Sequence, residues 1–239
     1  ELNSYCKFLA ESPNRSSVAD RLTQIPAAII SFKSIAVIWF EENQKEGRII
    51  GHRGFTHDLS ETIQELSDQT HSDWMVMGWN ARAHKGILVR NPIGWFVDHV
   101  NSDFALFRDN GVRYISKVVM ALRPGRKDKN FVAIADRVCL FYKASLTLLH
   151  VVDDGMSDAE MALVEASSNA LLKKAASPSN VIVKRAKKPI ETISVTSAEY
   201  DLLIIGTPEK GNWQNILLGK NKDRFADSSA CSVLRLTVK

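Results

Sequence analysis

From residue 115 onward, short apolar runs alternate with segments whose apolar residues recur at helical spacing. The runs 115–122 and 145–152 are nearly continuous, which is typical of parallel strands covered on both faces. Between them, 131–143 carries apolar residues every three or four positions, as expected of a helix packed on a sheet. Joining parallel strands in this way requires right-handed crossovers. The pattern therefore predicts a doubly wound, mostly parallel α/β fold.

The rest of this half follows the same alternation. Ser157 and Glu160 stand in capping-box positions and predict the start of a long helix. The predicted strands are 115–122, 145–152, 180–185, 200–205 and 232–238, and the predicted helices are 131–143, 157–176 and 190–197. Five strands and their crossovers make one complete α/β domain.

Two segments of the first half repeat in the second. Residues 73–78 match 201–206 at an offset of 128, and residues 96–107 match 225–236 at an offset of 129. Two matches at nearly one offset indicate duplication, with a boundary in the turn 108–112. We therefore expect two tandem five-stranded α/β domains, over residues 1–111 and 112–239.

The first domain is harder to interpret. A strand over 34–40 and a helix over 59–66 are predicted, but residues 1–31 supply no clean first strand. Either this domain has degenerated, or it lacks segments that the second domain keeps.

Composition argues against several classes of protein. The net charge of +4 is mild and no stripe of basic and aromatic residues occurs, so we expect no nucleic-acid partner. The apolar stretch 25–40 contains Pro26 and Lys33 and is too short to span a bilayer. Cys6, Cys139 and Cys231 lie in or beside apolar runs without metal-ligand spacing, which favours buried, reduced thiols in the cytosol.

Few residues suggest chemistry. His52 and His57-Asp58 lack a third ligand at a metal-binding spacing, and His150 lies inside a predicted strand, where a core histidine is expected. No nucleophile elbow, zinc-protease or Walker motif occurs. We therefore expect neither a catalytic nor a metal site, and predict that the protein is not an enzyme.

Two basic clusters, 123–129 and 184–188, fit either solvated loops or contacts with phosphate or anionic lipid. Asp153-Asp154 follows a predicted strand, where a turn with a helix-capping acid is expected. Trp39 and Trp74 fall in predicted strands and are expected in the core. Trp79, Trp95 and Trp213 follow strands or glycines, and we consider them as contacts with a subunit or a transporter.

The segments 117–123 (KVVMALR), 148–152 (LLHVV) and 201–206 (DLLIIG) resemble a universal stress protein domain in order and spacing. The resemblance covers most of 113–239, covers 73–107 more loosely, and barely extends to the first 70 residues. It implies Rossmann-like sheets of universal-stress-protein type. In stress-protein dimers the equivalent of the last strand lies at the subunit interface, so the resemblance also implies a homodimer.

Many universal stress proteins bind ATP through a glycine loop, whose backbone amides approach the phosphates. Gly206 and Gly219 keep the outer spacing of that loop, but Gly211 comes two places late and Lys220 replaces the expected hydroxyl residue. Leu122-Arg123 stands where the family has an acid, and Asn91 replaces the matching glycine of the first domain. The resemblance thus implies a degenerate nucleotide loop of Gly206, Gly211, Gly219 and Lys220, with Arg123 as an alternative phosphate partner. The competing structural interpretation is that Gly206 ends a strand and Gly219 opens a turn.

Tandem stress-protein domains with decayed loops resemble the cytoplasmic C-terminal domains of prokaryotic cation-chloride cotransporters. Met77-Gly78-Trp79 and Asn212-Trp213 are similar to segments of that family. Amino-acid permeases with appended stress-protein domains are a close competitor. The resemblance implies a non-catalytic regulatory and dimerisation domain on the cytoplasmic side of the cell membrane, joined to the membrane domain of its own transporter. It implies no cofactor. The alternative is a soluble tandem universal stress protein that binds ATP.

Overall fold

The computed structural model describes residues 35–37, 49–51, 65, 74–78, 103–123, 128–206 and 228–238. The chain divides into two compact units, and the second consists of Arg108–Thr207 with Asp223–Val238. The strands described before this unit are β1 (Ile35–Val37), β2 (Ile49–Gly51), β3 (Trp74–Gly78) and β4 (Asp103–Arg108). They pair in the order β2-β1-β3-β4, and all of these pairings are parallel.

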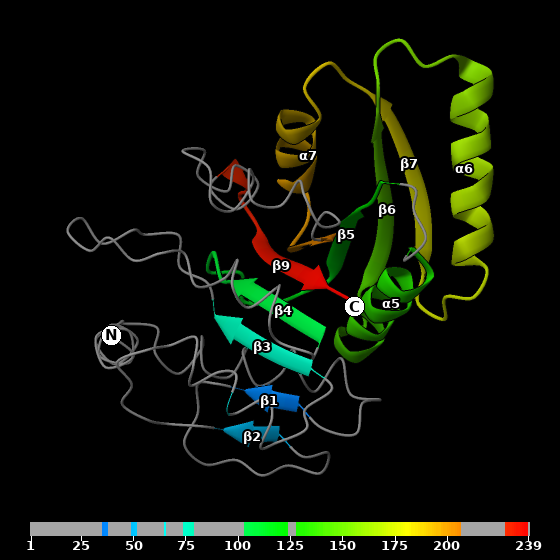
Figure 1. Cartoon of the computed structure of the whole chain (residues 1–239). Coiled ribbons are helices and arrows are strands. Elements are labelled where there is room, and N and C mark those ends of the chain that lie inside the picture. Colours follow the sequence, from blue (N-terminus) through cyan, green and yellow to red (C-terminus); the bar gives the residue numbers. More distant parts are fainter. Residues whose placement is uncertain are drawn as a thin grey trace. The chain divides into compact units, whose positions relative to one another are not determined.

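The second unit contains five described strands in the order β9-β8-β5-β6-β7, again with parallel pairings (Figure 1). The first of them along the chain, β5, lies between β6 and β8, so the chain winds outward in both directions. The elements are β5 (Lys117–Ala121), α5 (Asp128–Tyr142), β6 (Ser145–Val152), α6 (Asp158–Leu172), β7 (Ser179–Arg185), α7 (Pro189–Ser197), β8 (Leu202–Gly206) and β9 (Ser232–Thr237).

Each element predicted for the second half is present, with ends that shift by a few residues. The predicted helix 157–176 stops at Leu172, and the Asp136 carboxylate holds the turn that follows. Its oxygens accept the N–H groups of Ala176 at 3.1 Å and Ser177 at 2.9 Å. The mixed α/β class with a mostly parallel sheet is confirmed. The division into two tandem five-stranded domains stays a prediction, and most of the helix predicted over 59–66 lies outside the described residues.

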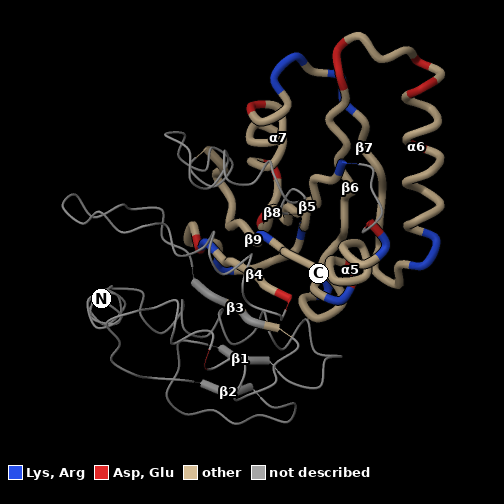
Figure 2. The backbone as a smooth tube through the Cα atoms, in the orientation of Figure 1, with Lys and Arg blue, Asp and Glu red and all other residues tan. Residues whose placement is uncertain are grey.

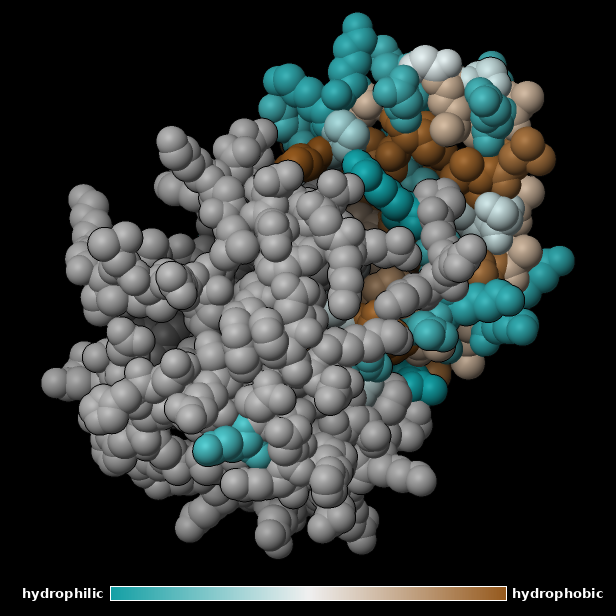
Figure 3. Space-filling model, in the orientation of Figure 1, coloured by the Kyte–Doolittle hydropathy of each residue, from teal (hydrophilic) through white to brown (hydrophobic). Residues whose placement is uncertain are grey.

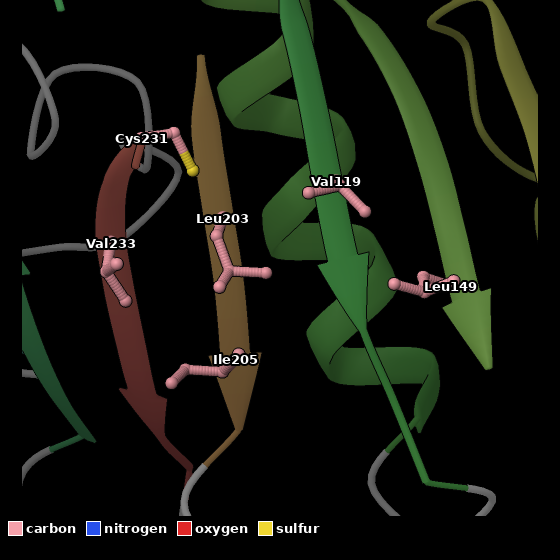
Figure 4. Packing of buried hydrophobic residues seen from close by; sticks show 6 residues of the cluster. All are labelled: Val119, Leu149, Leu203, Ile205, Cys231 and Val233. Atoms are coloured by element: carbon pink, nitrogen blue, oxygen red, sulfur yellow. The ribbon is translucent and has the colours of Figure 1, made fainter. Parts of the chain in front are cut away.

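The two faces of the second sheet are covered by different helices. Side chains alternate along a strand, so neighbouring residues of β6 face opposite sides. Leu149 belongs to a buried cluster against which Ile193 of α7 packs, whereas the next residue, His150, contacts Ser168 of α6. Figure 4 shows this cluster, which consists of Val119, Leu149, Leu203, Ile205, Cys231 and Val233.

Cys139 and Cys231 are free and buried. Burial raises the pKa of the Cys139 thiol to about 12, and it also raises the pKa of Cys231. Both groups are therefore protonated thiols that pack as small apolar residues, as the sequence predicts.

The predicted capping box at the start of α6 is confirmed. Ser157 Oγ accepts the Glu160 N–H at 3.3 Å, and Glu160 Oε2 accepts the Ser157 N–H at 2.8 Å. The Ser157 hydroxyl also donates to Glu160 Oε2 at 2.7 Å, and this bond, followed by the one from the Ser157 N–H, lowers the pKa of the Glu160 carboxyl. Asp153 and Asp154, which were expected to cap this helix, do not. Asp153 Oδ1 instead accepts the Gly155 N–H at 2.9 Å and forms a turn before the helix.

Polar side chains form hydrogen bonds with the backbone at the starts of several strands of this unit. The amide group of Asn110 donates to the carbonyl oxygens of Ser229 at 3.0 Å and Cys231 at 2.7 Å, immediately before β9. The Asp201 carboxylate accepts the N–H groups of Ser116 at 2.7 Å and Lys117 at 2.9 Å, and so joins the starts of β8 and β5. No helix among the residues that the structure describes is long and apolar enough to cross a membrane.

Candidate functional site

The candidate site lies where β5 and β8 end. Sheets of this kind place ligands outside the carboxyl ends of the strands, at the point where the winding reverses. Here that point lies between β5 and β8, next to Leu122, Arg123 and Gly206. Leu122 is buried and donates its N–H to the Leu149 carbonyl at 3.1 Å, whereas Arg123 is exposed.

An aromatic side chain packs against the glycine at this edge. Phe131, in the first turn of α5, is 8% exposed. A Cβ placed on Gly206 would lie 3.3 Å from Cζ of the Phe131 ring, closer than ordinary van der Waals contact. Glycine at 206 is therefore explained by packing within the chain, because any larger residue would push against the ring.

Of the predicted loop residues, the structure describes only Gly206, at the end of β8. Gly211, Gly219 and Lys220 lie outside the described residues, as do Trp39, Trp79, Trp95, Trp213 and the histidines at 52 and 57.

Trp74 is fully buried in β3, which confirms the prediction that it belongs to the core. Over the described ranges, no group of His, Cys, Asp and Glu side chains could hold a metal ion.

The basic cluster 184–188 is largely paired with acidic and polar groups of the same unit. Figure 2 marks the charged positions along the backbone of this unit. Arg185 pairs with Asp158 and donates to the Met156 carbonyl at 2.7 Å, and Lys187 lies 3.7 Å from Asp154. Lys188 pairs with Glu191 at 3.0 Å, and Lys184 donates to Thr196 Oγ1 at 3.0 Å. These contacts join the turn after β6 to the turn after β7. They offer a structural role for a cluster that the sequence left open between a solvated loop and an anion contact.

His150 is a core residue, as predicted, but it has a partner that sequence reasoning missed. Ser168 of α6 lies with its Oγ 2.7 Å from His150 Nε2, and the same hydroxyl donates to the Val164 carbonyl at 2.7 Å. The single hydroxyl proton is thereby used, so Ser168 accepts a hydrogen bond from Nε2–H of the ring. Both side chains are 2% exposed, so this pair has no access to a substrate. The position of Ser168 within the predicted helix was visible in the sequence. Serine is too common in helices for that position to reveal a hydrogen bond with His150.

Acidification is expected to destabilise the fold through His150. Burial lowers the pKa of this residue below 6.5, and the Asp128 charge and the Leu122 carbonyl only partly oppose that effect. As the pH falls below 6.5, the unfolded state binds a proton that the folded state does not, so stability decreases until the lowered folded pKa is passed. Denaturant unfolding at about pH 7.5 and about pH 5.5 should show a larger loss for the wild type than for His150→Gln. Equal losses would contradict this.

Several known structures have the same fold as this chain. A universal stress protein from Archaeoglobus fulgidus DSM 4304 aligns with a TM-score of 0.64 at 15% identity, covering 94% of this chain and 92% of its own. A putative universal stress protein from Pseudomonas aeruginosa UCBPP-PA14 aligns at 0.61 and 13% identity, covering 88% and 95%. The fold is of the universal stress protein type. No protein-family model matches the sequence, and no curated protein matches it.

The cytoplasmic domain of a prokaryotic cation chloride cotransporter has the same fold. It aligns with a TM-score of 0.63 at 10% identity, over 92% of this chain and 90% of its own. The three similarities extend over most of the chain. At such identities they establish the architecture and leave the function to the residues themselves.

Proposed function

We propose that this chain is a non-catalytic regulatory and dimerisation domain on the cytoplasmic side of a membrane transporter, of the cation-chloride cotransport type. The observation that carries the non-catalytic part is the packing of Phe131 against Gly206, beside Leu122-Arg123 in place of an acid. The Phe131 ring lies against Gly206 at the end of β8, and the acid that the stress-protein family has after the first strand is absent; both support a domain without the nucleotide site of that family. The transporter part is supported by the motifs at 77–79 and 212–213 and by the fold of the cotransporter domain.

The mechanism in this proposal is mechanical. Each orientation of a dimeric cytoplasmic domain favours one state of the membrane domain attached to it, so association shifts a conformational equilibrium without chemistry. The proposal requires membrane-spanning segments in the same gene, upstream of Glu1. A full reading frame without them would rule out the transporter role.

The second candidate is a soluble tandem universal stress protein that binds ATP. The outer spacing of Gly206 and Gly219 favours it, and so does the similarity to the Archaeoglobus fulgidus protein. Arg123 is exposed beside this edge and offers a phosphate partner.

Calorimetric titration with Mg-ATP at near-millimolar concentration separates the two candidates. A folded sample is expected to give no saturable heat, because Phe131 and the altered loop leave no complete phosphate cradle. The control is a titration of Gly206→Val, which should look the same as the wild type. Saturable binding that this substitution abolishes would favour the stress protein that binds ATP.

A further inference from the structure

Helix α6 has an apolar side that no described residue of its own unit covers. It packs on β6 and β7 through the side on which Ser168 and Leu172 are buried. At about 3.6 residues per turn, the opposite side is centred on Ala159, Leu163, Ala166 and Ala170, which we call the outer seam. All four are exposed, and Leu163 has 71% of its surface accessible. Figure 3 shows apolar residues at the surface along the flank that α6 occupies in Figure 1.

A helix that packs on one side normally carries charged residues on the other. The acidic residues of α6, Asp158, Glu160 and Glu165, instead lie to the sides of the outer seam. The seam residues follow one another at intervals of four, three and four, the spacing by which one helix packs along another. Three of the four are alanines, which allow a close approach of two helix axes.

The charges of α6 are arranged along its length. Asp158 and Glu160 stand at its start, and Lys173 and Lys174 follow its last turn. A second α6 running in the opposite direction would set each acidic end beside a basic end, whereas a parallel one would place like charges together. Asp158 already pairs with Arg185, so Glu160 and the two lysines supply most of the complementarity.

We propose that α6 pairs antiparallel with α6 of a second copy of this chain, through the outer seam and with a two-fold axis between Leu163 and Ala166. Such a contact is self-complementary, as a two-fold interface requires. The inference rests on the dimerisation in the proposed function, and it assigns the contact surface to α6 instead of the last strand, which is the surface that the resemblance implies. A helix of 15 residues offers a small interface, so we expect association that depends on concentration.

A membrane surface is the competing occupant, and the charges disfavour it. Helices that lie on membranes carry lysine and arginine along their polar sides, which attract anionic lipids. Within α6 the sides of the outer seam carry Glu160 and Glu165, and basic residues follow only at its end, at Lys173 and Lys174.

The test compares Leu163→Lys with Val195→Lys by sedimentation equilibrium. Val195 on α7 is 74% exposed and is a matched control, because it lies outside the seam. Leu163→Lys is expected to raise the dimer dissociation constant on the order of 100-fold, since each dimer loses two apolar contacts. Val195→Lys should dimerise like the wild type. Circular dichroism should show the same helix content in all three proteins.

A cysteine cross-link tests the axis independently. In a Cys6→Ser background, Ala166→Cys should form a disulfide-linked dimer on mild oxidation, and Val195→Cys should not. A Leu163→Lys protein that stays dimeric, with no link at 166, would overturn the proposed surface and leave dimerisation intact. A wild type that is monomeric at every concentration would overturn both. Loss of binding to phosphatidylglycerol vesicles in Leu163→Lys, from a monomeric wild type, would assign the seam to lipid and overturn the pairing.

Discussion

Phe131→Ala is expected to lower the free energy of unfolding by about 3–5 kcal/mol. The ring is 8% exposed and fills the space between the first turn of α5 and the end of β8. Its removal takes away apolar contacts and leaves a cavity beside Gly206, which the surrounding backbone is too constrained to close. Urea unfolding followed by circular dichroism measures the loss.

Phe141→Ala is the matched control, because the same helix carries this ring with 46% of its surface exposed. Phe141→Ala should lower the free energy of unfolding by only about 1 kcal/mol, since about half of this side chain already contacts water. Similar losses for the two variants would show that Phe131 does not pack as the structure has it. They would also remove the main support for a domain without a nucleotide site, which is the contact of Phe131 with Gly206.

Asp201→Ala is expected to cost about 2 kcal/mol of stability. The carboxylate accepts two backbone N–H groups, of Ser116 at 2.7 Å and Lys117 at 2.9 Å, and its own N–H donates to the Lys117 carbonyl at 2.9 Å. These bonds hold together the starts of β5 and β8, the two strands at the centre of the second sheet. Alanine would leave two exposed amide donors with water in place of a charged acceptor, so the expected loss is that of hydrogen bonds to a charged group.

The control for this position is Asp201→Asn, which retains an acceptor oxygen without the charge. It should lose about half as much as alanine, because hydrogen bonds to neutral acceptors are weaker. Thermal unfolding of both variants gives the comparison. Wild-type stability in Asp201→Ala would show that the hydrogen bonds at this edge contribute nothing measurable.

The elements of the second half were predictable because their signals are strong and local. β6 is an almost uninterrupted apolar run, and Ser157 with Glu160 marks the start of α6. Helix ends are less predictable, since the turn that follows α6 is held by Asp136, more than thirty residues away in sequence. The segments 35–37 and 49–51 are strands of three residues, too short for a periodic pattern to identify the second of them.

The site could be predicted only in outline. The glycine at 206 was identified from loop spacing, but its contact with Phe131 depends on how α5 lies over the sheet. The pairing of the basic cluster with Asp154 and Asp158 is equally a product of the fold, because parallel strands bring the turns after β6 and β7 to one edge. Charge runs in a sequence do not reveal such partners.

The hydrogen bonds from Asn110 to the residues before β9 also affect how the protein folds during synthesis. Asn110 emerges from the ribosome more than a hundred residues before the carbonyl groups that it binds at Ser229 and Cys231. Until then, β8 has an unpaired edge and the apolar side chains of β5 and β8 lack part of their cover. Until its last strand is made, the nascent second unit therefore presents an unpaired strand edge and uncovered apolar side chains, which favour association with other chains.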